Sequence, residues 1–223
     1  MKNKKSFSRR DVTKQIGVAA GVGLVGPGLA LAAVATPAQV EGPFHPIDQQ
    51  ADTDLDLTLI EGRSERAKGE TILVRGQVLD TDGHPLSDAI VDVWQANSVG
   101  RYSHPKDTNT APLDPNFQGW GLITTNSGGR FGFKTIKPGA YPLSFLGEEG
   151  WRCKHVHFKV SRSGYSELIT QMYFNGDPLI EQDLEIAKVP EEHRHLLIAD
   201  SVTDETTGHP LFHFDLTLAS LSA

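Results

Sequence analysis

Short runs of alternating or β-branched residues, separated by turns rich in Gly, Pro, Asp and Asn, limit most strongly how this chain can fold. Such runs predict strands, because successive side chains of a strand face opposite sides of a sheet. The expected strands are residues 71–78, 89–94, 121–125, 130–135, 155–160, 168–174 and 211–218. The sequence has no long helical periodicity, apart from a turn of helix expected over residues 190–195. The spacing of these runs predicts an all-β fold, a β-sandwich of antiparallel strands with long loops.

The first 35 residues predict an export signal that precedes the fold. A basic start is followed by an apolar stretch from Ile16 to Ala35, which ends in the small residues Ala33-Val34-Ala35. The segment Ser8-Arg9-Arg10-Asp11-Val12-Thr13-Lys14 resembles a twin-arginine signal. A retained membrane anchor is the alternative, since the apolar stretch is about long enough to span a bilayer. Its glycines and Pro27 favour a signal, so we expect an exported, periplasmic protein.

Three segments are expected: residues 1–35 as the signal peptide, 36–70 as an irregular arm along the surface, and 71–223 as the sandwich domain. Without the signal, the chain has 15 Lys and Arg against 27 Asp and Glu, a formal charge of −12. A protein this acidic is a poor candidate for binding nucleic acid, which requires positive charge. No second apolar run predicts a membrane span in the mature form. The single cysteine, Cys153, excludes an internal disulfide.

Two histidines one residue apart, His155 and His157, occur in the run Trp151-Arg-Cys-Lys-His-Val-His-Phe-Lys-Val160. In a strand, Val156 and Phe158 would face one side and the histidines the other. Two imidazoles about 6.6 Å apart along one face can bind a single metal ion. The alternative is a hydrogen-bonded pair within the sandwich core.

Two of the four tyrosines occupy expected loops, although a core tyrosine usually lies in a strand. Tyr102 follows Gly100-Arg101, and Tyr141 lies in Lys137-Pro-Gly-Ala-Tyr-Pro142. Phenolate is a hard, anionic oxygen donor that suits a trivalent ion, and imidazole also suits iron. Ionising a tyrosine at pH 7 costs about 4 kcal/mol. Two tyrosinates therefore require a strongly charged metal.

Six motifs follow one another along the chain: Thr36-Pro-Ala-Gln-Val-Glu-Gly-Pro-Phe44, Val93-Trp-Gln-Ala-Asn97 through Gly100-Arg-Tyr102, Leu113-Asp-Pro-Asn-Phe117, Thr135-Ile-Lys-Pro-Gly-Ala-Tyr-Pro142, His155-Val-His157 and Thr170-Gln-Met-Tyr-Phe174. In this order they resemble the intradiol ring-cleavage dioxygenases, most closely the protocatechuate 3,4-dioxygenase β-type chain. The resemblance covers roughly residues 36–178. The motifs start directly after the expected signal, without the helical segment that dimerises catechol and hydroxyquinol dioxygenases, which favours a protocatechuate-like architecture.

The resemblance implies a mononuclear, non-haem Fe(III) ion held by Tyr102, Tyr141, His155 and His157 and completed by hydroxide. It also implies that Arg152 and Gln171 lie beside the substrate, with Arg152 stabilising negative charge that develops there. Tyr141 is expected to take part in catalysis as well, because a tyrosinate displaced by the substrate is a base.

The implied reaction inserts O2 between the two hydroxylated carbons of a catechol-type, protocatechuate-like aromatic and gives a muconate-type diacid. The expected partners are this small molecule and O2, with a homo-oligomer or a hetero-oligomer left open.

Two other functions remain open at the level of sequence. One is an exported, non-catalytic β-sandwich that binds aromatics or sugars, and the other is a copper or zinc enzyme built on the His-x-His pair.

His193 and His195 repeat that spacing, but we expect them on a helical turn, where they point apart on the surface. His104 either lines the mouth of the pocket or is exposed. The tryptophans are expected to serve in packing: Trp94, Trp120 and Trp151.

Two positions depart from the family pattern near the expected substrate. Cys153-Lys154 precedes the histidines where the family has proline followed by a small residue. Leu143 follows Tyr141-Pro142 where protocatechuate enzymes tend to carry an aromatic side chain. These departures leave the identity of the catechol open, and a free thiol close to ferric iron is exposed to oxidation.

Overall fold

A computed structural model describes residues 33–47 and 52–221. The chain divides into two units, Met1–Ala30 and Leu31–Ala223, and every described residue belongs to the second. The expected signal over residues 1–35 lies almost wholly outside the described residues. Within the described part of the chain, no helix has the length and apolarity needed to cross a bilayer.

The first of two five-stranded sheets is built around its longest strand, β1 (Thr71–Asp80). This strand pairs antiparallel with β4 (Arg130–Ile136). It pairs parallel with β11 (Pro210–His213) through its first half and with β12 (Leu216–Leu218) through its second half. The short strand β10 (Ser201–Thr203) adds to β11.

The second sheet carries the two histidines on its central strand. Its order is β3 (Trp120–Thr124), β2 (Ile90–Trp94), β7 (His155–Ser161), β8 (Leu168–Phe174) and β9 (Ile198–Ala199). All neighbours are antiparallel except β8 and β9. The fold is therefore largely β-strand, as predicted, but the expectation of purely antiparallel pairing is wrong, because three strand pairs are parallel.

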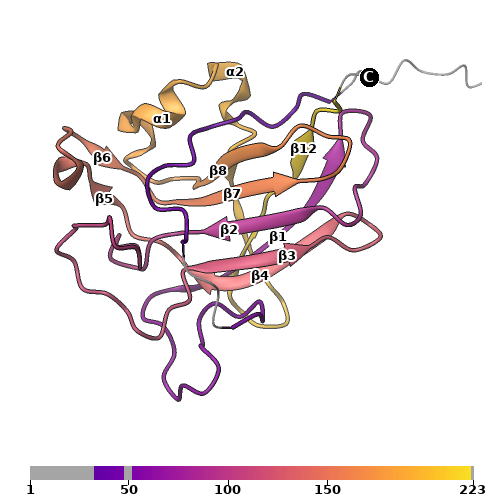
Figure 1. The fold of residues 1–223 in the computed structure, drawn as a ribbon. Helices are drawn as coiled ribbons and strands as arrows, with labels where there is room; N and C mark the ends of the chain where they lie inside the picture. Colours follow the sequence, from indigo (N-terminus) through magenta and orange to yellow (C-terminus); the bar gives the residue numbers. More distant parts are fainter. Residues whose placement is uncertain (1–32, 48–51, 222–223) are drawn as a thin grey trace, which may run out of the picture. The chain divides into compact units, whose positions relative to one another are not determined.

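Short elements gather at the end of the second sheet where β7 begins (Figure 1). They are the ribbon of β5 (Tyr141–Pro142) and β6 (Trp151–Arg152), the 3-10 turns Ser144–Leu146 and Ile180–Gln182, and the helices α1 (Leu184–Ala187) and α2 (Glu191–Arg194). Helix α2 confirms the expected turn of helix. The ribbon, α1, β9 and β10 were not expected from the sequence, because each is too short to show a periodicity.

The core lies between the two sheets. Val156 and Phe158 of β7 are fully buried, and the Phe158 ring lies 6.1 Å from Phe131 of β4 and 5.0 Å from Phe214. This agrees with the predicted alternation along β7. Since the inward face of β7 is apolar, His155 and the other odd-numbered positions face the opposite side of the sheet.

The predicted strands are present with ends shifted by one or two residues, except the last. The run 211–218 was expected to be one strand but forms β11 and β12, which are separated at Phe214 and Asp215. The Phe214 side chain is buried in the core, while the Asp215 carboxylate accepts a hydrogen bond from the Gln77 backbone at 2.9 Å. A side chain thus replaces a backbone partner of β1 and interrupts the strand.

The segment before β1 is irregular, as expected, but it is not confined to the surface. Leu57 is only 1% exposed and packs into the core. Next to it, the Asp56 carboxylate lies 3.0 Å from both Arg66 and Lys134. Burial alone would raise the pKa of Asp56, but hydrogen bonds from Thr58, Lys134 and Arg66 lower it to about 2. This cluster fastens the arm to β4.

Candidate metal centre

His155 and His157 lie at the first and third positions of β7, where neighbouring strands fix them from both sides. Trp94 at the end of β2 pairs with His157, and Gln171 of β8 pairs with it from the other side. Although these positions face away from the core, both histidines are only 2% exposed. Loops and the arm therefore cover this face of the sheet.

Two glycines allow the loops that carry Tyr102 and Tyr141 to cross in contact. Gly100 has a φ of 80°, and a Cβ there would lie 2.3 Å from the Ala140 carbonyl oxygen. A Cβ on Gly139 would lie 2.4 Å from the Gly100 nitrogen. Both approaches exclude any larger residue. The crossing brings the rings of Tyr102 and Tyr141 to 5.8 Å at 81°.

The four residues expected as ligands come together in one buried place. The Tyr102 hydroxyl lies 3.2 Å from Nε2 of His155. Ring centroids are 4.8 Å apart for the two histidines, 5.7 Å for Tyr141 and His155, and 6.2 Å for Tyr102 and His157. Each of the four is at most 3% exposed.

Local contacts orient the two imidazoles. Nδ1 of His155 donates to the Cys153 carbonyl at 2.7 Å, so that Nε2 keeps its lone pair. His157 stacks parallel on Trp94 at 4.7 Å and 4°. Among the described residues Nδ1 of His157 has no hydrogen-bond partner, and stacking therefore holds this ring instead. Gly42 of the arm closes the other side, because a Cβ there would lie 3.6 Å from Cε1 of His157.

Burial makes all four donor groups electrically neutral in the protein alone. It raises the pKa of Tyr102 well above its usual value, and the neighbouring Tyr141 raises it further. Burial likewise raises the pKa of Tyr141, and it lowers the pKa values of His155 and His157 well below the usual range. Neutral imidazoles are competent ligands, and the phenols can ionise only beside a strong cation. The donor set fits a hard, trivalent ion.

Arg152 and Gln171 lie together beside the tyrosines. Arg152 on β6 pairs with Tyr141 on β5, and its Nη2 donates to Oε1 of Gln171. Although burial opposes the charge, Tyr141 and then Asp183 raise the pKa of Arg152 above its usual value. The side chain is therefore a guanidinium, 8% exposed, at the edge of the site.

The arm supplies a wall of the site that the sequence did not predict. Phe44 lies 4.8 Å from the Tyr102 ring and 5.9 Å from His104. His104 is 8% exposed, so the exposed alternative for this residue is wrong. A buried apolar cluster surrounds the phenols and separates them from solvent: Phe44, Trp94, Ala96, Tyr102, Tyr141 and Leu143.

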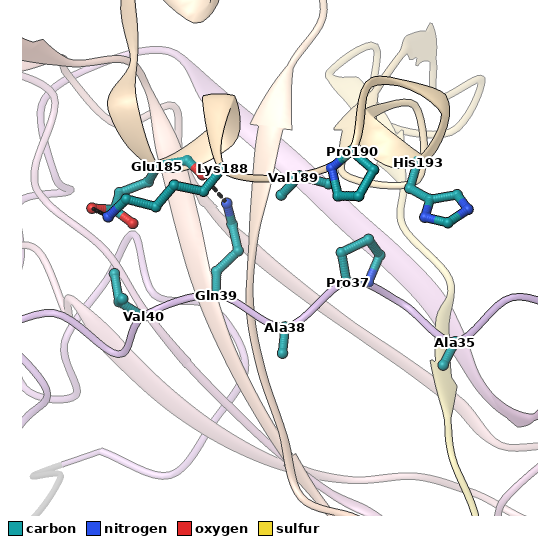
Figure 2. A pocket seen from close by; sticks show the side chains of 10 residues that line it. All are labelled: Ala35, Pro37, Ala38, Gln39, Val40, Glu185, Lys188, Val189, Pro190 and His193. Atoms are coloured by element: carbon teal, nitrogen blue, oxygen red, sulfur yellow. Dashed lines mark hydrogen bonds and ion pairs between the residues drawn. The ribbon is translucent and has the colours of Figure 1, made fainter.

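The arm also connects the site to α1. Gln39 accepts a hydrogen bond from the Tyr173 hydroxyl at 3.1 Å and donates to the Glu185 carbonyl at 3.2 Å. Figure 2 shows the Gln39 side chain reaching from the arm to α1, where it lines a pocket of about 480 Å³ that none of the expected ligands lines. This role of Gln39 could not be predicted from the sequence, because it depends on contacts between distant segments.

Two further expectations concern tryptophans and surface histidines. Trp94 is buried, as expected, but Trp151 is 47% exposed, so its expected packing role is wrong. Trp151 lies in the two-stranded ribbon, where it pairs with Pro142, and not in the core. His193 lines the cavity of Figure 2, and His195 is exposed. Neither belongs to a cluster of metal-binding groups in the described part of the chain.

Comparison with known proteins adds independent information. A sequence model of the family described as Dioxygenase matches residues 40–220. The chain is 42% identical over 184 residues to the protocatechuate 3,4-dioxygenase beta chain of Burkholderia cepacia, covering 81% of this chain and 78% of that protein. It is 35% identical to hydroxyquinol 1,2-dioxygenase of Rhizobium sp., covering 67% of this chain but only 51% of that protein.

A solved structure of a ring-cleavage dioxygenase also resembles this chain. The crystal structure of 3-chlorocatechol 1,2-dioxygenase from Rhodococcus opacus superposes with a TM-score of 0.65 at 26% identity. The match covers 85% of this chain and 74% of that one.

Proposed function

Because the chain belongs to the intradiol ring-cleavage dioxygenases, we propose that Tyr102, Tyr141, His155 and His157 hold a mononuclear non-haem Fe(III) ion at which a catechol is cleaved. One observation carries the proposal: two phenols and two imidazoles converge in one buried place, where the lone pair of His155 Nε2 meets the Tyr102 hydroxyl at 3.2 Å. A ferric ion there would act as a Lewis acid that withdraws electron density from a bound catecholate. With two tyrosinates and a hydroxide, the centre is electrically neutral.

The residues of the chain perform the remaining tasks. Arg152 lowers the pKa of Tyr141, against the effect of burial, and so favours its phenolate. If the substrate displaced Tyr141 from the metal, the phenolic oxygen of Tyr141 could accept a substrate proton. The backbones of both tyrosines are held in place, because Asp107 accepts a hydrogen bond from the Tyr102 nitrogen at 2.7 Å and Tyr141 pairs with Arg152 in the ribbon. Phe44 and Leu143 exclude water from the reacting groups.

Arg152 stabilises the negative charge that develops as O2 adds to the ring, and Gln171 orients it. The overall reaction balances without an external reductant: catechol and O2 combine to give a muconate-type diacid that contains both oxygen atoms. Protocatechuate is the first candidate substrate, since the protocatechuate 3,4-dioxygenase beta chain from Burkholderia cepacia has the highest identity of the matches given above, 42%. Leu143 in place of an aromatic side chain supports testing unsubstituted and hydroxylated catechols as well.

Oxygen uptake by iron-loaded protein with catechol, protocatechuate, hydroxyquinol and larger polyphenols tests this function. We expect uptake with at least one of them, a burgundy colour from tyrosinate-to-iron charge transfer, and loss of both in Tyr102→Phe. Tyr165→Phe is the matched control, since Tyr165 lies at an isolated bridge to Ser220. A colourless iron protein without uptake would favour a non-catalytic binding protein and refute the proposal.

We further propose that residues 1–35 direct export through the twin-arginine route to the periplasm. The support is Arg9-Arg10 followed by an apolar stretch and Ala33-Val34-Ala35. The double variant Arg9→Lys, Arg10→Lys should accumulate in the cytoplasm, as seen by cell fractionation. Undiminished export of this variant would contradict the proposed route.

A further inference from the structure

Asp183 is a fully buried carboxylate that meets three separate parts of the chain. Its Oδ2 accepts hydrogen bonds from Nε of Arg152 and from the Cys153 backbone nitrogen, both at 2.9 Å. Its Oδ1 accepts from the backbone nitrogens of Glu185 at 2.9 Å and Ile186 at 3.4 Å, which caps α1. One side chain thus joins β6, the residue that leads into β7, and the start of α1.

The guanidinium of Arg152 is held at two points, which fix its plane. Nε is bonded to Asp183 on one side, and Nη2 is bonded to Oε1 of Gln171 on the other. Gln171 is itself fixed, because its Nε2 donates to the Val40 carbonyl at 3.2 Å. Among the described residues no acceptor is bonded to Nη1. The two anchors therefore leave both N–H groups of Nη1 and one of Nη2 available to a ligand.

The Cys153 nitrogen explains why this carboxylate suits this chain. Proline at position 153 would have no N–H to donate. Here Cys153 supplies that N–H, and Asp183 accepts it together with the Arg152 donor. Both oxygens of the buried carboxylate are satisfied in this way, which a buried charge requires.

We propose that Asp183 is a positioning residue for the ring-cleavage reaction, which holds the Arg152 guanidinium in the orientation that stabilises the reacting substrate. The inference rests on the proposed function, since Arg152 acts on a bound catechol. Asp183 has no hydrogen bond to the expected ligands, and we expect it to act on the reacting groups through Arg152. A misplacement of about 1 Å in a catalytic group can lower a rate by roughly a hundredfold.

Asp183→Asn tests the proposal, because it keeps the Oδ1 acceptor that caps α1 and replaces Oδ2 with an amide that cannot accept from Arg152. Asp183→Ser is the second variant, since serine is also a preferred cap. We expect kcat to fall by roughly 10- to 100-fold with a small change in KM. Iron content and the charge-transfer band of the resting protein should be unchanged.

Asp177→Asn is the matched control. Asp177 is likewise a buried carboxylate that accepts from a backbone nitrogen next to the site, Lys154 at 3.0 Å, and from Leu179 in the following turn at 3.0 Å. It has no bond to Arg152 in the described part of the chain. We expect its kcat to stay near that of the wild type.

Two further measurements separate positioning from a structural effect. In ¹⁵N-edited NMR spectra of the metal-free protein, the signal of the Arg152 Nε–H is assigned by its loss in Arg152→Lys. We expect this proton to exchange slowly with water. This protection should disappear in Asp183→Asn and remain in Asp177→Asn. In an Arg152→Gln background, Asp183→Asn should lower kcat little further, because the guanidinium that Asp183 positions is already absent.

The outcomes of these measurements distinguish a positioning role of Asp183 from a purely structural one. Equal losses of kcat in Asp183→Asn and Asp177→Asn, or an equal loss with and without Arg152, would overturn the positioning role. Failure of both Asp183 variants to fold while Asp177→Asn folds would assign Asp183 a purely structural role and also overturn it. A wild-type protein inactive with every catechol would instead refute the proposed function, whatever the NMR signal of Arg152 shows.

Discussion

Adding Fe(III) to the metal-free protein should release protons, two of which come from Tyr102 and Tyr141. Burial raises the pKa values of both tyrosines above the usual value of 10, so each carries its proton in the metal-free protein at neutral pH. If both oxygens coordinate the ion, both protons must leave. A third would come from a water that becomes the bound hydroxide.

The cost of this ionisation sets the size of the effect. A pKa of 10 lies three units above pH 7, which corresponds to about 4 kcal/mol for each tyrosine, or about 8 kcal/mol for the pair. Burial makes this a lower limit. Each released proton makes the apparent affinity for iron rise about tenfold for each unit of pH, as long as the pH stays below the pKa of the group that loses it. The two phenols therefore contribute about 100-fold for each unit, and the third proton brings the total to about 1000-fold.

Calorimetry in two buffers of different ionisation enthalpy counts the protons. Iron is added as a chelate, and the protons released by the chelate alone are subtracted. Tyr102→Phe should release one proton fewer, and Tyr165→Phe should release the same number as the wild type. If Tyr102→Phe leaves the count unchanged, or if iron affinity does not depend on pH, the two phenols are not ligands and the reasoning fails.

Three other predictions concern stability and reactivity. Because the Asp56 pKa is lowered from 3.8 to about 2, the carboxylate stabilises the fold above pH 3.8 by about 1 to 2 kcal/mol, allowing for its partial exposure. This contribution is lost as the pH falls through 2, so urea unfolding should separate wild type from Asp56→Asn at neutral pH but not at the acid limit. Leu57→Ala should cost about 2 to 5 kcal/mol in the same assay, whereas Leu55→Ala, at a 36% exposed position, should cost well under about 1 kcal/mol. Burial, and then the charge of Asp183, raise the pKa of the Cys153 thiol well above its usual value, so iodoacetamide should alkylate it only after unfolding; rapid alkylation of the native protein would contradict its burial.

Features that depend on local periodicity could be predicted from the sequence. The alternation in β7 places Val156 and Phe158 in the core and His155 on the other face, because a strand repeats every two residues whatever surrounds it. The glycines before Tyr102 and Tyr141 mark positions where backbones approach closely, although only the structure shows that they approach each other.

Features that depend on contacts between distant segments could not be predicted. Asp183 and Arg152 are 31 residues apart, and nothing in either local sequence indicates an ion pair. The wall formed by Phe44 and the link through Gln39 depend in the same way on where the arm lies against β8 and α1. The break between β11 and β12 results from one side-chain bond, from Gln77 to Asp215, that competes with a regular strand.

Charge balance explains why tyrosine suits a buried site of this kind. A carboxylate with an ordinary pKa near 4 would be charged at pH 7 before any metal arrived, and an unpaired charge is costly to bury. A tyrosine is neutral without the metal and would be anionic when bound to it. The four donor groups can therefore be buried in their neutral forms before a metal binds. Two charges beside them, those of Arg152 and Asp183, neutralise each other through a 2.9 Å contact. We therefore expect the protein to fold without the ion, in contrast to small zinc domains, whose folding is driven by metal binding. Each later step would then conserve the charge of the site. A ferric ion would replace three protons, and a catecholate dianion would replace one tyrosinate and one hydroxide.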